Sequence, residues 1–193
     1  MSLAETSLAY AFLGAATVVA EVAAGHNLNE ALAAFWRNRP ELPPGQRGAV
    51  QDLAYTALRR YGRDDFFLSR LLDRPLRDRP AHALLLVALA RLAARPEEAH
   101  TIVDQAVEAA GDLAHGKYKG LVNGVLRNFL RRRTELEAAA GQDQVARWQH
   151  PRWWIDRLRH AHPGDWQAQL EAGNGRPPMT LRVNRRRVAA ADY

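Results

Sequence analysis

Apolar residues recur at helical spacing through most of the chain, and this pattern limits the possible folds more than any other feature. It is clearest at Tyr118, Leu121, Val122, Val125, Leu126, Phe129 and Leu130. Such spacing puts all of these side chains on one face of a helix. Similar faces precede it, within residues 8–22, 28–35, 50–61, 66–72, 84–92 and 99–110. We therefore predict an all-α fold, a compact bundle of roughly six or seven helices within a first domain of residues 1–140.

Glycines, prolines and a capping residue predict where these helices begin and end. Gly25 ends the first helix, and Asn27 caps the second. A loop is expected from Pro40 to Gly48, and Pro96 opens a later helix at its first turn. Residues 84–92 are apolar on nearly every side, so they predict the central, buried helix.

The composition changes after residue 140. Gly141 predicts a linker, and Met179 to Val183 predict a strand. Pro177 and Pro178 stop any helix before the predicted strand begins. We therefore expect a second region, residues 141–193, with a short helical linker and the first strand of an incomplete α/β subdomain. A small core is the simpler interpretation of its tryptophans, and base stacking is the alternative; these are Trp148, Trp153, Trp154 and Trp166.

Positive charge is unevenly distributed along the sequence. The formal net charge is +6, with 27 Lys and Arg against 21 Asp and Glu. Residues 1–35 contain three glutamates and no Lys or Arg, so they carry −3 and the remainder carries +9. Only Lys117 and Lys119 are lysines. Either a polyanionic partner or an arginine-rich codon usage explains this balance, and the charge alone does not separate the two.

The strongest candidate interface lies between residues 117 and 133, which contain six basic residues and no acid. Lys119, Asn123, Arg127 and Arg131 are four residues apart, so they form a polar stripe about 18 Å long. Such a stripe can meet several phosphates, although a merely solvated helix face is the alternative. The predicted RNA-binding residues are Lys117, Lys119, Arg127, Arg131, Arg132 and Arg133, with Arg182 in the tail.

Other polar features of the sequence have simpler interpretations. Gly120 and Gly124 flank Asn123, which predicts a close helix crossing there. Asp64-Asp65 and Glu97-Glu98 are expected to be solvated helix ends rather than catalytic pairs. Two further basic clusters are present, and the sequence does not show whether they share a face with the first; they are Arg59, Arg60 and Arg63, and Arg74, Arg77 and Arg79.

Signals of independent catalysis are missing from the sequence. There is no cysteine, which excludes disulfides, thiolate ligands and a thiolate nucleophile. No histidine pair has zinc-protease spacing, and no glycine-rich phosphate loop is present. Leu8 to Ala20 is too short to span a membrane. We expect a cytoplasmic chain that is not a self-sufficient enzyme and has no metal, cofactor or membrane partner of its own.

The run Lys119-Gly120-Leu121-Val122-Asn123-Gly124-Val125-Leu126-Arg127 closely resembles the penultimate helix of NusB-like domains. The helices around residues 99–110 and 53–60 fit the same pattern. The resemblance covers about residues 5–135 and implies a helical module that binds RNA or docks a protein. RNA-binding members often carry basic residues near the N-terminus, and this chain does not, so the expected RNA surface moves to residues 117–133 and Arg182.

The tail resembles the connection into the catalytic part of RsmB (Sun/Fmu) type rRNA methyltransferases. The matching motifs are His150-Pro151-Arg152-Trp153, Asn174, Arg176-Pro177-Pro178 and Leu181-Arg182-Val183-Asn184. This resemblance implies S-adenosylmethionine-dependent methylation of cytosine C5 in 16S rRNA, carried out by cysteines and a cofactor site that have no counterpart here. The cofactor is therefore implied only for a full-length parent, whose methyltransferase domain would be this chain's own missing partner.

The sequence thus indicates the rRNA-recognition part of such a methyltransferase, truncated before the catalytic domain. A degenerate gene product is the alternative origin. A stand-alone NusB-type antitermination factor, which binds RNA and a ribosomal-protein partner, is the alternative function. A purely structural helical adaptor is a third possibility.

Overall fold

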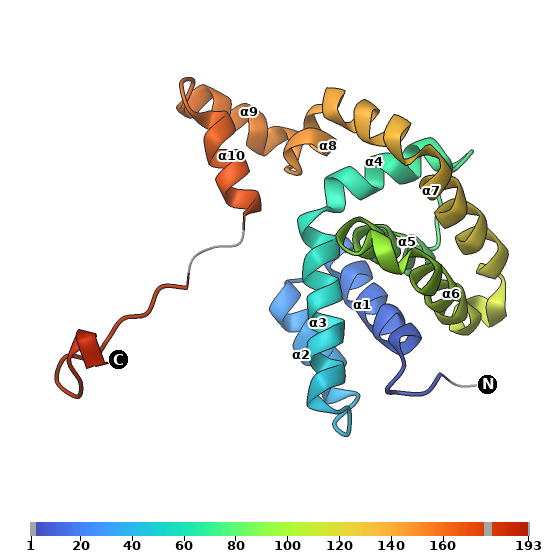
Figure 1. Ribbon diagram of the computed structural model, residues 1–193, viewed down its shortest axis with the longest axis horizontal. Helices are drawn as coiled ribbons and strands as arrows, with labels where there is room; N and C mark the ends of the chain where they lie inside the picture. The colour runs from blue at the N-terminus through green and yellow to red at the C-terminus, as the bar shows by residue number, and fades with distance from the viewer. Residues whose placement is uncertain (1–2, 176–178, 193) are drawn as a thin grey trace.

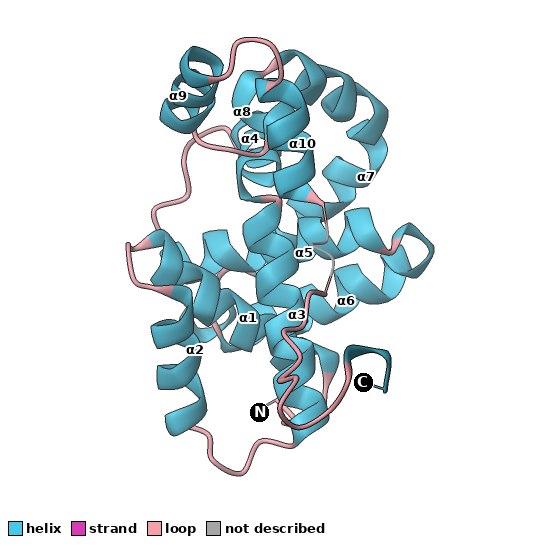
Figure 2. Cartoon of the chain, turned by 90° about the vertical axis from the view of Figure 1, so that its left-hand side faces the viewer, coloured by secondary structure: helices cyan, strands magenta, loops and turns pink. Residues whose placement is uncertain are grey.

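The computed structural model describes residues 3–175 and 179–192, and within them every regular element is helical (Figures 1 and 2). The all-α prediction is therefore confirmed. The helices are α1 Leu8–Ala23, α2 Leu28–Arg37, α3 Pro44–Arg59, α4 Tyr61–Leu71, α5 Arg79–Ala94, α6 Ala99–Ala109, α7 Lys119–Gln142, α8 Gln144–Trp148, α9 Arg152–Ala161 and α10 Trp166–Asn174.

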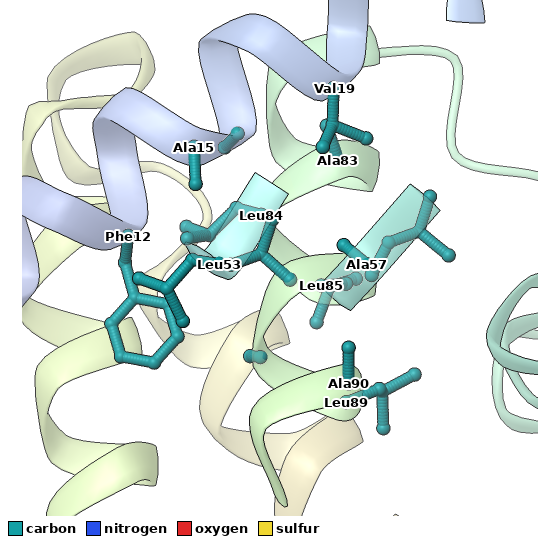
Figure 3. Packing of buried hydrophobic residues seen from close by; sticks show 14 of the residues in the cluster. Phe12, Ala15, Val19, Leu53, Ala57, Ala83, Leu84, Leu85, Leu89 and Ala90 are labelled. Carbon is teal, nitrogen blue, oxygen red and sulfur yellow. The ribbon is translucent and has the colours of Figure 1, made fainter. Parts of the chain in front are cut away.

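Helix α5 forms the centre of the bundle, as its all-round apolar sequence predicts. Every residue from Leu84 to Leu92 except Arg91 is buried. Helix α5 packs against α1, α3 and α6, and Figure 3 shows α1, α3 and α5 side chains meeting in one cluster. These contacts remove a large apolar surface from water, which is the main favourable term in folding.

Capping residues, glycines and prolines explain several of the helix ends. The Asn27 side chain accepts a hydrogen bond from the backbone N–H of Asn29 at 2.9 Å, as a helix cap should. Gly25, after the end of α1, has φ +103°, a conformation that favours glycine. Pro96 opens a short 3-10 turn, Pro96–Glu98, which leads directly into α6.

The predicted loop at Pro40 to Gly48 is too long. Helix α3 begins at Pro44, so only the first part of that segment is irregular. Proline fits the first helical position because its fixed φ is already helical and the N–H there needs no partner within the helix. Pro44, one of the prolines in the predicted loop, is therefore the residue that starts the helix.

The region after α7 has a second, smaller core. Trp148, Ile155, Leu158 and Leu170 are buried together, and Trp166 packs against them. Trp148 and Trp166 meet edge to face, with ring centroids 5.3 Å apart. The small-core interpretation is thus confirmed for two of the four tryptophans, while Trp153 is 64% exposed and Trp154 is 37% exposed.

The strand predicted at Met179 to Val183 is wrong for this structure. These residues are irregular and are followed by a turn, in which the backbone N–H of Arg187 donates to the Asn184 carbonyl at 2.8 Å. A strand requires a neighbour to exchange backbone hydrogen bonds, and the described residues provide none. Pro177 and Pro178, predicted to stop the preceding helix, lie outside the described residues.

Candidate nucleic-acid interface

Helix α7 carries the main candidate surface along the edge of the bundle (Figure 1). Its inner face is buried against α4, α5 and α6, with Val122, Leu126 and Phe129 fully covered. Its outer face exposes Lys119, Arg127 and Arg131. The amphipathic spacing in the sequence therefore predicted which side of this helix faces solvent.

The close helix crossing predicted around Asn123 is wrong. Gly120 and Gly124 are exposed, and a Cβ added at either position would meet nothing within 4 Å. The two glycines instead leave the helix surface open at two positions between Lys119 and Arg127. A glycine pair permits a close crossing but does not require one, which is why the sequence suggested more than the fold contains.

Arg127 and Arg131 stand beside an open groove between α6 and α7. The groove has a volume of about 520 Å³, and its lining includes Val103 and Leu130. Neither arginine forms an ion pair with a carboxylate within residues 3–175 and 179–192. Both guanidinium groups are consequently available to an anionic partner.

Arg132 differs from its two neighbours because it is already bonded within the protein. Its guanidinium donates to Glu135 from Nε at 3.1 Å and from Nη2 at 2.8 Å, and Nη1 reaches the Arg70 carbonyl at 3.4 Å. The hydrogen bond with Glu135 raises the pKa of Arg132 and lowers that of Glu135. Arg133 is only partly exposed. Of the predicted run, Arg127 and Arg131 are therefore the better placed for a ligand.

The start of α7 lies beside the loop that precedes α5. The Tyr118 side chain faces Asp78, and desolvation together with this carboxylate raises the pKa of the phenol. The exposed Lys117 ammonium lies 5.6 Å from the centroid of the Tyr118 ring. The contact between Tyr118 and Asp78 therefore brings the residue that precedes α5 next to the start of α7.

The second basic cluster is largely neutralised. Arg60 forms two hydrogen bonds with Asp64, at 2.9 and 3.2 Å, and Arg63 is paired with Glu137 of α7. Asp64 was expected at a solvated helix end, and that prediction is wrong because its side chain is fully buried. Burial raises the pKa of Asp64 to about 6, although Arg60 opposes the shift. The spacing of four residues signals the first pair, but nothing in the sequence signals the second.

Arg182 is exposed in the irregular segment after residue 178. Within the described residues, no hydrogen bond or ion pair links Arg182 to α7.

The described residues also hold no group of three or more His, Asp or Glu side chains arranged for a metal ion. None of the described helices combines the length and the apolarity that crossing a membrane requires.

The fold and its outer surface define the chain as a helical bundle with a basic outer helix, α7. Comparison with known families shows which family this bundle belongs to. The model of the NusB family matches residues 13–131, and the chain belongs to that family. Residues 150–193 match the ferredoxin-like domain of RsmF/B-like methyltransferases. The resemblance inferred from the α7 and tail motifs is thereby confirmed.

Similar curated proteins carry the name ribosomal RNA small subunit methyltransferase B rather than that of an antitermination factor. The protein from Cronobacter sakazakii is 40% identical over 154 residues, covering 75% of this chain and 35% of the relative. The protein from Vibrio cholerae serotype O1 is 35% identical over 171 residues, covering 88% of this chain and 39% of the relative. The protein from Escherichia coli O6:H1 is 38% identical over 153 residues, covering 75% of this chain and 35% of the relative. The chain thus spans little more than a third of each relative.

Proposed function

We propose that this chain recognises small-subunit (16S) rRNA as part of a cytoplasmic, S-adenosylmethionine-dependent rRNA cytosine-C5 methyltransferase. The observation that carries the proposal is the exposed face of α7, where Lys119, Arg127 and Arg131 have no carboxylate partner in the described residues. The names of the methyltransferase relatives support the choice of rRNA as the polyanion.

The outer face of α7 suits contact with the RNA backbone rather than readout of sequence. Lys119 to Arg131 spans about 18 Å of helix, enough for several phosphates. Arginine pairs with phosphate through two parallel N–H groups, and each contact releases condensed counterions. Such contacts hold and orient the RNA without specifying bases. Recognition is the role of this chain, because the cysteines that the family's chemistry uses are absent from its sequence.

We also propose that the chain divides between its two hydrophobic cores. Ala146 of α8 belongs to the main core, and Trp148 belongs to the second one. The predicted division at residue 140 lies close to this point, although Gly141 is still within α7. A division between Ala146 and Trp148 would leave the main bundle complete and assign α9 and α10 to the second region.

The salt dependence of RNA binding tests the proposed function. We expect the full chain to bind a labelled 16S rRNA fragment in fluorescence anisotropy, with affinity falling as salt rises. Replacing Arg127 and Arg131 together by Ala should reduce the slope of log K against log[salt] by about 1.4 to 1.8, because two phosphate contacts are lost. The control is Arg132→Ala, since Arg132 is already bonded to Glu135 and should change the slope little. An unchanged slope in the double variant would reject this face of α7.

A further inference from the structure

The groove between α6 and α7 combines an apolar floor with a cationic rim. Val103 on its floor is 4% exposed, and Ala99 and Leu130 beside it are half-buried. Arg127 and Arg131 line the α7 side, one helical turn apart, which is about 6 Å along the axis. The groove of about 520 Å³ is therefore open, apolar at its base and positively charged along one edge.

The opposite rim belongs to α6 and carries one acid. The Asp104 carboxylate lies 3.3 Å from the His100 imidazole, and the His100 side chain is 88% exposed. Asp104 thus faces its own histidine, while no carboxylate pairs with either arginine in the described residues. The rim residues Arg127 and Arg131 outweigh the single acid, so the groove attracts anions.

We propose that this groove receives one unpaired base of a single-stranded RNA segment, with the flanking phosphates on Arg127 and Arg131. This inference rests on the proposed RNA-recognition function and adds the site and the form of RNA that it takes. A nucleobase has flat apolar faces, which suit Ala99, Val103 and Leu130, and it is joined to the anionic backbone that the two arginines require. The exposed ring of His100 stands at the edge of the groove, where it can stack on the base.

Charge complementarity favours a nucleotide over a protein helix as the occupant. An amphipathic helix needs a row of apolar anchor sites extending over about two turns. This groove offers a floor of three apolar side chains and places charged residues on both sides of it. A short apolar floor beside Arg127 and Arg131, which form no ion pair with the described residues, matches one base and its phosphates more closely.

The test compares base-bearing RNA with abasic RNA of the same length, because the two carry the same phosphates. In anisotropy measurements, the full wild-type chain should bind the base-bearing strand about tenfold more tightly than the abasic strand. Ala99→Leu fills the groove without changing any charge, so this variant should bind the two strands equally. His100→Ala, which removes an exposed ring from the rim, should lower the preference as well.

The matched control is Ala94→Leu, which adds the same carbons at an exposed helical position that does not line the groove. It should keep the wild-type preference. If Ala99→Leu and His100→Ala both keep the preference, or if wild type shows none, the base site is overturned while phosphate binding stands. Failure of wild type to bind either strand at low salt would overturn the proposed function and the base site together.

Discussion

Asp64 is the charged residue whose position in the fold has the clearest energetic consequence. Its carboxyl group is fully buried beside Arg60, where α3 passes into α4. Burial disfavours the charged form and raises the pKa of Asp64 from 3.8 to about 6. The folded state therefore binds a proton more tightly than the unfolded chain does.

This shift predicts that Asp64 contributes most to stability below about pH 4 and that the contribution is lost as pH rises through 6. Each pKa unit corresponds to about 1.36 kcal/mol, so the free energy of unfolding falls by on the order of 3 kcal/mol. Asp64→Asn has a similar shape and does not titrate. Chemical denaturation at pH 4 and pH 8 should show wild type losing stability relative to Asp64→Asn on going to the higher pH. A constant difference between the two proteins would contradict the shift.

Individual side chains also show how far the sequence alone could lead. The exposure of Lys119, Arg127 and Arg131 followed from helical periodicity, because one face of α7 had to be apolar. The engagement of Arg132 by Glu135 is a contact three residues away and could have been anticipated. The pairing of Arg63 with Glu137 could not, because 74 residues separate them and only the packing of α4 on α7 brings them together.

At the scale of elements, two helical glycines illustrate opposite roles. A Cβ at Gly14 in α1 would lie 2.8 Å from Phe35 Cζ and 2.9 Å from Val50 Cγ2, so this glycine allows α1 to pack closely on α2 and α3. A Cβ at Gly124 in α7 would meet open space. The same residue type is needed for packing in the first helix and costs stability in the other.

We therefore expect Gly14→Ala to destabilise the chain by about 1–3 kcal/mol through steric overlap. Gly124→Ala should stabilise it by about 0.5–1 kcal/mol, because alanine has the higher helix propensity and nothing obstructs its methyl group. Urea denaturation of both variants checks these signs. Equal effects at the two positions would show that the packing around Gly14 has been misjudged.

The existence of the main helices was predictable because spacing, caps and prolines agreed on them. Boundaries were less certain, as the start of α3 at Pro44 shows. The strand at Met179 to Val183 failed for another reason. A strand is defined by its hydrogen-bonded neighbour, and an alternating or apolar segment carries no information about whether that neighbour is present.

At the scale of the whole molecule, the two hydrophobic cores should respond separately to mutation. Ile155 is fully buried in the smaller core, and Leu85 of α5 lies in the larger one. Ile155→Ala should increase amide hydrogen exchange in α9 and α10 and leave the protection of α5 unchanged, because few apolar contacts support the smaller core. A loss of protection in α5 would show that the two cores unfold as one unit.

The distribution of charge over the whole chain leads to the central claim that RNA lies against α6 and α7 and not against α1 and α2. Ultraviolet cross-linking of the full chain to a 16S rRNA fragment, followed by mass spectrometry of the peptides, locates the RNA directly. We predict cross-links in residues 99–133 and none in residues 3–35, which contain no lysine or arginine. Cross-links concentrated in residues 3–35, with none in α6 or α7, would contradict the account.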